Sequence, residues 1–136
     1  MFRSSILTAI VALGGSAALA QDAADVYAAG RDEYLVACSA CHGEAADGKG
    51  ELATMFTTQI PDLTGISLRN DGVFPMLRVI QTIDGRAVIV AHGNPMPLFG
   101  SRFSAEADSD GAVLGAEAIA RGRVLELALY IQSIQQ

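Results

Sequence analysis

The segment Cys38-Ser39-Ala40-Cys41-His42, CSACH, contains both cysteines of this 136-residue chain and one of its two histidines. Two thiols three positions apart on a helical turn point to the same side. Such a pair can be a disulfide, a redox-active dithiol, half of a zinc site or the attachment point of a cofactor.

The first three interpretations fit the surrounding sequence poorly. A disulfide here would close a very short loop and stabilise the fold little. A thiol oxidoreductase site is expected after a strand in a βαβ unit, whereas residues 25–38 have helical periodicity. Structural zinc needs two further soft ligands, and beyond the cysteines the chain offers only His42 and His92.

The fourth interpretation uses all three residues at once. Two sulfurs on one side of a helical turn can form thioethers with the two vinyl groups of a haem, and His42 can place an imidazole nitrogen on the iron. This C-x-x-C-H arrangement is the attachment signature of c-type haem. The sequence therefore predicts one haem c per chain, tethered by Cys38 and Cys41 and ligated by His42.

The amino terminus has the pattern of an export signal. Arg3 precedes an apolar run over residues 6–13, and Ala18-Leu19-Ala20 provides small residues for a signal peptidase. We expect residues 1–20 to be the signal, 21–25 a flexible linker and 26–136 one domain in the periplasm, where c-type haem is attached in bacteria. An uncleaved anchor is the alternative, but the run is short for a membrane span, and no stable insertion is expected after cleavage.

Charge limits the kinds of partner. The chain has nine basic and fifteen acidic residues and a formal charge of −6; without Arg3, eight basic residues face fifteen acidic ones, which gives −7. Lys49 is the only lysine. Nucleic acid is therefore not expected as a partner, because phosphate binding requires clustered lysine and arginine.

The pattern of apolar residues and breakers predicts an all-α domain. Helices are expected over residues 25–38, from Pro75 to Gly85 and over 116–136, the last with an apolar stripe. Residues 43–75 contain many glycines and prolines and indicate a long loop with short helical turns. Residues 104–111, SAEADSDG, are acidic and are expected to form a solvated loop.

The second axial ligand is expected in the segment GNPMPLFG. Met96 lies there between two prolines, which stiffen the backbone and hold the side chain in a fixed position. Met76 is on the apolar face of a predicted helix, and Met55 is only 13 residues beyond His42. His92 is the second candidate, and ligation by two histidines would lower the reduction potential.

With these residues identified, the chain resembles the class I cytochromes c of bacteria. Gly30 and Tyr34 are similar to the glycine and aromatic residue at the family's helix crossing, and Tyr130 to the aromatic residue of the partner helix. The haem motif and the methionine loop also match, and several segments are similar to the cytochrome domains of cbb3-type oxidases. The resemblance implies three to five helices wrapped around one covalently bound haem, with the N- and C-terminal helices packed together.

The resemblance also implies roles for residues around the haem. Pro61 is similar to the loop proline whose carbonyl accepts a hydrogen bond from the ligand histidine. Arg86 and Arg102 flank the methionine segment, and they either contact the haem propionates or are solvated surface charges. An apolar wall against the ring is expected from five residues: Leu63, Leu77, Ile80, Phe99 and Phe103.

These inferences predict a periplasmic one-electron carrier with His/Met ligation and no enzymatic activity. The expected partners are a redox donor and acceptor with neutral or basic surfaces, since the lysine ring of mitochondrial-type carriers is missing, and the chain is expected to be a monomer. The alternatives are a haem-containing subunit or partner of a membrane oxidase or dehydrogenase, and a five-coordinate haem enzyme or sensor.

Overall fold

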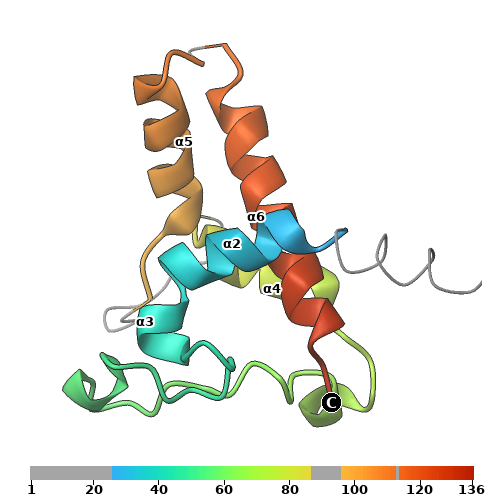
Figure 1. Ribbon diagram of the computed structural model, residues 1–136. Coiled ribbons are helices and arrows are strands. Elements are labelled where there is room, and N and C mark those ends of the chain that lie inside the picture. Colours follow the sequence, from blue (N-terminus) through green and yellow to red (C-terminus); the bar gives the residue numbers. More distant parts are fainter. Residues whose placement is uncertain (1–25, 87–95, 113) are drawn as a thin grey trace, which may run out of the picture.

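The computed structural model describes residues 26–86, 96–112 and 114–136 (Figure 1). Within these ranges there are five α-helices and two 3-10 turns and no strand, which confirms the all-α prediction. The elements are α2 (Ala28–Ala37), α3 (Ser39–His42), η1 (Ala53–Met55), η2 (Leu68–Asn70), α4 (Met76–Asp84), α5 (Phe99–Ser109) and α6 (Ala116–Ser133). The predicted signal and linker and His92 lie outside the described residues.

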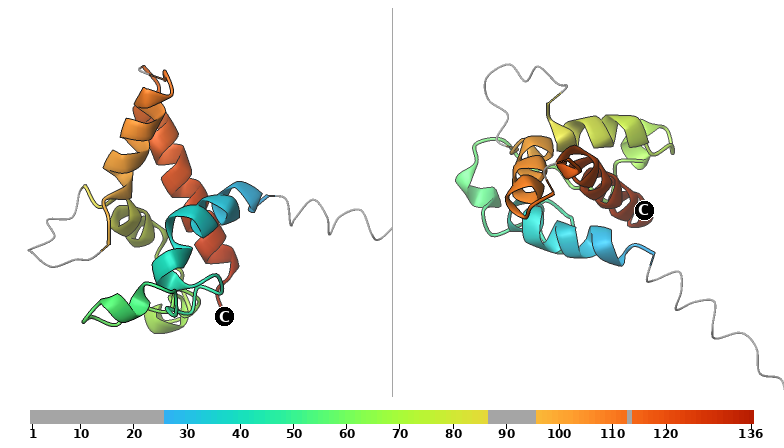
Figure 2. Two further views of the ribbon diagram at one scale, coloured as in Figure 1. Left: turned by 60° about the vertical axis from the view of Figure 1, so that its left-hand side comes forward. Right: turned by 90° about the horizontal axis from the view of Figure 1, so that it is seen from above.

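Helix α6 is the central element. It contacts α2, α4 and α5, and it runs beside α5 as an upright pair that α2 crosses (Figures 1 and 2). The predicted apolar stripe forms the buried face of α6, since four of its five residues are almost fully buried: Val124, Leu127, Ala128 and Ile131. Tyr34 from α2 and Phe103 from α5 complete the centre of the core.

The crossing of α2 and α6 depends on Gly30. A Cβ atom at this position would lie 2.1 Å from the carbonyl oxygen of Glu126, so only glycine lets the two backbones approach this closely. Next to the crossing, the rings of Tyr34 and Tyr130 pack with their centroids 5.3 Å apart. The predicted packing of the N- and C-terminal helices is therefore present.

This crossing gives a prediction with a matched control. Gly30→Ala should destabilise the protein by about 1–3 kcal/mol, because the added methyl group forces the helices apart. Gly122→Ala, in the middle of α6 where no atom lies within 4 Å of the new Cβ, should be neutral or stabilising by up to about 1 kcal/mol. Thermal unfolding of both variants measures the difference, and equal melting temperatures would contradict the close crossing.

Arg123 joins three helices. Its guanidinium pairs with Glu33 of α2 at 2.7 Å and with Glu106 of α5 at 2.8 Å, and it stacks 3.8 Å from the centroid of Phe103. These carboxylates raise the pKa of Arg123, and because the group is partly buried the network is screened less than a fully exposed ion pair. Arg123 thus fixes the position of α5 relative to α2.

The prediction of a solvated acidic loop over residues 104–111 is wrong for most of that segment, because α5 continues to Ser109. The reason is tertiary: Phe103 and Ala107 are buried one turn apart, and Glu106 is paired with both Arg102 and Arg123. The acidic residues face outward on a helix whose other face is part of the core.

Helix α4 and the long loop follow the predictions. The helix begins after Pro75 and ends at Gly85, which has a φ of 73° and is thus in the left-handed region that favours glycine. Between residues 43 and 75 the chain forms only the two 3-10 turns. Gln135, beyond α6, fastens this loop to the core by donating to the carbonyl of Leu63 and accepting from the amide of Ser67.

Candidate functional site

The CSACH segment forms a tight turn at the end of α2. Cys38 separates α2 from α3, and the amides of Cys41 and His42 both donate to its carbonyl. The loop that follows returns to cap this turn, since Gly50 and Leu52 donate backbone bonds to Cys41 and Ala40. A Cβ at Gly50 would lie 2.3 Å from the Ala40 oxygen, so this return requires glycine.

His42 is held by Pro61. Its Nδ1 lies 3.2 Å from the Pro61 carbonyl oxygen, which can only accept, so Nδ1 carries the hydrogen and Nε2 keeps a free lone pair. Burial lowers the pKa of His42, with the bond to Pro61 acting in the opposite direction. The ring is therefore neutral at neutral pH, the form in which Nε2 can ligate a metal ion.

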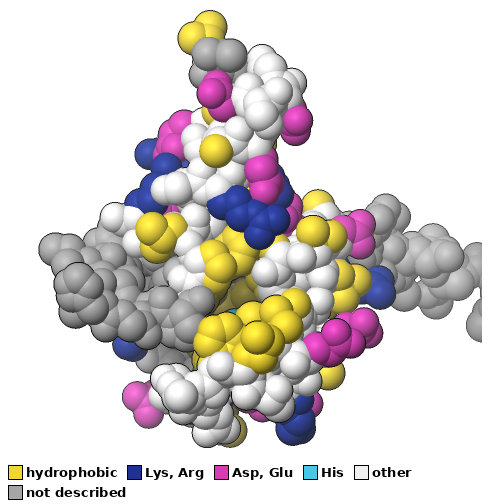
Figure 3. Space-filling model, turned by 90° about the vertical axis from the view of Figure 1, so that its left-hand side faces the viewer, with side chains coloured by type: hydrophobic (Ala, Val, Ile, Leu, Met, Phe, Trp, Pro, Cys, Tyr) yellow, Lys and Arg dark blue, Asp and Glu magenta, His cyan; other side chains and the backbone are white. Residues whose placement is uncertain are grey.

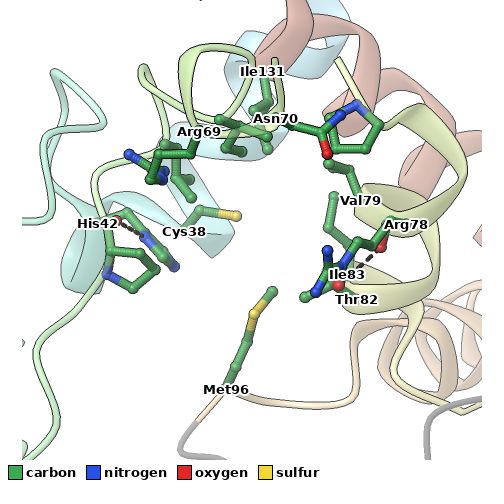
Figure 4. Close-up of a pocket in the computed structure, with 14 residues that line it drawn as sticks. Cys38, His42, Arg69, Asn70, Arg78, Val79, Thr82, Ile83, Met96 and Ile131 are labelled. Atoms are coloured by element: carbon green, nitrogen blue, oxygen red, sulfur yellow. Dashed lines mark hydrogen bonds between the residues drawn. The ribbon is translucent and has the colours of Figure 1, made fainter. Parts of the chain in front are cut away.

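A cavity of about 400 Å³ lies beside this histidine (Figure 4). The sulfur of Cys38 points into it from one side, and Met96 reaches into it from another. It is lined by Cys38, His42, Pro61, Leu63, Ile66, Arg69, Asn70, Pro75, Arg78, Val79, Thr82, Ile83, Met96 and Ile131. Its volume is within the range of small-molecule and cofactor sites, and its walls are mainly apolar.

A second cavity of about 250 Å³ adjoins the first. Five residues line both, namely Cys38, His42, Pro61, Thr82 and Met96, so the two cavities are neighbours. Cys41, which does not line the first cavity, lines the second. All four of the predicted covalent and axial residues therefore line one or both of two adjacent cavities, although His42 and Met96 are far apart in sequence.

Neither cysteine is in a disulfide. Cys38 is buried, and burial together with nearby Glu33 raises the pKa of its thiol to about 12. A redox-active or nucleophilic cysteine needs the opposite, a lowered pKa and access to solvent. The environment of Cys38 therefore argues against a reactive thiol at this position.

The other sulfur candidates for the second axial position lie elsewhere. Met76 packs against the core cluster, and Met55 is 75 % exposed; neither lines either of the two cavities. His92 is outside the described residues. Among these candidates, Met96 is the described residue that shares the cavities with His42.

The two arginines selected from the sequence do not line the cavities. Arg86 pairs with Asp84 and Glu117, both at 2.7 Å, and Arg102 pairs with Glu106 at 2.7 Å. Arg69 and Arg78 line the larger cavity instead, and neither has a carboxylate partner within the described part of the chain. Arg69 also donates to the carbonyl of Asp62. No local pattern distinguished these two arginines, because η2 and α4 bring them together only in three dimensions.

The predicted apolar wall is partly present. Leu63 and Phe99 line the cavities, while Ile80 and Phe103 belong to the core behind them. The prediction for Leu77 was wrong, since this side chain is 68 % exposed. It lies on the outer face of α4, whose inner face presents Val79 and Ile83.

No family model, curated protein or solved structure matches the chain. Within the described ranges, no group of three or more His, Cys, Asp and Glu side chains is arranged to hold a metal ion. None of the described helices combines the length and apolar character that crossing a bilayer requires.

Proposed function

We propose that this protein is a one-electron carrier with a covalently attached haem c. The observation that supports it best is that Cys38, Cys41, His42 and Met96 line two adjacent, mainly apolar cavities. When bound, the haem iron supplies the reversible one-electron couple.

The residues of the chain have distinct roles in this proposal. Cys38 and Cys41 tether the group, and His42 offers Nε2 because Pro61 fixes its other nitrogen. Met96 offers a soft thioether, which favours the reduced state and raises the potential. The apolar lining excludes water, so little reorganisation accompanies electron transfer.

We further propose that Arg69 and Arg78 hold the haem propionates, in place of Arg86 and Arg102. Both arginines line the larger cavity, Arg69 from η2 and Arg78 from α4, and among the described residues neither forms an ion pair with a carboxylate. Arginine binds carboxylates through paired hydrogen bonds, so the two propionates match this donor set.

A panel of four variants tests this assignment. Arg69→Gln and Arg78→Gln should each lower the reduction potential, because a positive charge near the iron disfavours the oxidised state. A charge about 15 Å away at an effective dielectric constant near 20 corresponds to about 1 kcal/mol, roughly 40 mV. Arg86→Gln and Arg102→Gln, which remove charges already paired outside the cavity, should change it much less. Redox titrations in which Arg86→Gln and Arg102→Gln lower the potential more than Arg69→Gln and Arg78→Gln would assign propionate binding to Arg86 and Arg102.

The function itself is tested by the spectrum of the purified protein, with haem quantified per chain. One haem per chain and low-spin oxidised iron with a methionine-to-iron charge-transfer band support the carrier. High-spin iron that binds carbon monoxide readily when reduced would identify a haem enzyme or sensor instead. Absence of haem would refute the proposal.

Export is part of the proposal, because haem attachment to this motif takes place outside the cytoplasm in bacteria. Cleavage after Ala20 should give a mature chain that begins at Gln21. N-terminal sequencing of protein from a periplasmic extract measures this. Protein found solely in the membrane fraction with residues 1–20 retained would show that the segment is an anchor.

A further inference from the structure

The smaller cavity has no charged side chain among its described lining residues. The exposed residues of this lining are polar but neutral or apolar: Thr58, Gln59, Pro61, Thr82 and Pro97. Figure 3 shows a hollow bordered by hydrophobic side chains, with a histidine visible inside it. His42, the proposed haem ligand, lines the smaller cavity.

The described segments that contribute to this cavity are uncharged over longer stretches. Residues 52–61 and 96–101 contain no Asp, Glu, Lys or Arg, although the whole chain has a formal charge of −6. Two of the basic residues near these segments are neutralised by carboxylates: Lys49 pairs with Asp47 at 2.8 Å, and Arg102 with Glu106 at 2.7 Å. The excess negative charge of the protein is therefore carried by other parts of the chain.

Large apolar side chains are exposed in the same segments. Met55 is 75 % exposed, Leu98 49 % and Leu52 42 %. These exposed residues are next to residues that line the smaller cavity. Met55, at the end of η1, precedes Phe56, and Leu98 lies between Pro97 and Phe99. Depletion of charge and enrichment in methionine and aromatic residues are typical of the buried centre of protein interfaces, and methionine adapts to different partner shapes.

We propose that this face, formed by residues 52–61 and 96–98, is the docking surface for a redox partner protein whose own contact surface is uncharged and apolar. The inference rests on the proposed function, because the electron would cross where Cys41 and His42 line the cavity. A partner with a charged contact surface would lose the hydration of its charges here without gaining an opposite charge. An uncharged apolar surface meets no such penalty.

Electron self-exchange between reduced and oxidised copies of the holoprotein tests the proposal, with the second copy as the probe of an uncharged apolar surface. Magnetic resonance line broadening in mixtures of the two states gives the second-order rate. The rate is measured between about 0.1 M and 1 M salt. Already at 0.1 M, charges more than roughly 10 Å from the contact are screened, so the change in rate over this range reports the charges close to the contact. We expect the rate to change less than about twofold over this range.

Two variants give the matched comparison. Met55→Lys and Thr58→Lys place like charges on both copies at the contact, so at 0.1 M salt each should slow self-exchange about tenfold or more, with recovery towards 1 M. Leu114→Lys adds the same charge at a fully exposed position between α5 and α6, at the far end of that helix pair from α3, and should leave the rate unchanged (Figure 1).

The outcomes separate the two proposals. A wild-type rate that depends steeply on salt, or equal effects of Met55→Lys and Leu114→Lys, would overturn the docking surface while leaving a haem-containing carrier intact. A purified chain without haem gives no exchange signal and would overturn both. Circular dichroism of the three variants ensures that a slow rate is not the result of misfolding, and a misfolded Met55→Lys leaves Thr58→Lys as the deciding variant.

Discussion

Serine in place of both Cys38 and Cys41 should leave a protein that retains no haem after denaturation. The side chains of both cysteines line the cavities, and a serine hydroxyl cannot form the thioether that makes attachment permanent. In a domain this small the haem would form much of the core, so folding should fail as well. Acid extraction followed by mass spectrometry of the chain measures the effect.

The control is Ser39→Ala, in the same turn. The Ser39 hydroxyl donates to the Leu35 carbonyl at an exposed position, so its loss should affect attachment little. Each single cysteine variant should retain at most one thioether and give a lower yield of holoprotein. Covalent haem on the double variant would show that another residue is the tether.

Met96→Ala should keep the haem attached but lower the reduction potential by more than about 100 mV. Axial ligands set the potential over a wide range, and loss of the thioether removes the group that favours the reduced iron. A redox titration followed by absorption measures the shift, and the charge-transfer band of the methionine ligand should disappear with it.

Met76→Ala and Met55→Ala are the matched controls for this variant. Met76 packs against the core, so its loss should lower the melting temperature by the cost of a partly buried side chain while the potential stays near that of the wild type. Met55 is exposed, and its loss should change neither. An unchanged reduction potential in Met96→Ala would show that a residue other than Met96 is the second axial ligand, and His92 would be tested first.

The residues that line the two cavities were predictable where their signal is local. CSACH contains two cysteines and a histidine in five consecutive residues, and the two prolines around Met96 distinguish that methionine from the others. Which arginines line the larger cavity was not predictable, because Arg69 and Arg78 differ from Arg86 and Arg102 only in what lies near them after folding.

By itself, the sequence determined the helical class, the turn that contains both cysteines, the limits of α4 and the buried stripe of α6, because helical periodicity, proline and glycine act within a few residues. The tertiary structure alone decided three other features. Residues 104–109 are helical because Phe103 and Ala107 become buried and Arg123 binds Glu106. Arg69 and Arg78 line the larger cavity because η2 and α4 border it from different sides (Figure 4). Leu77 is exposed because packing against α5 and α6 selects the other face of α4. Each of these features depends on contacts between residues that are distant in the chain. A local sequence pattern does not reveal the free energy of such contacts.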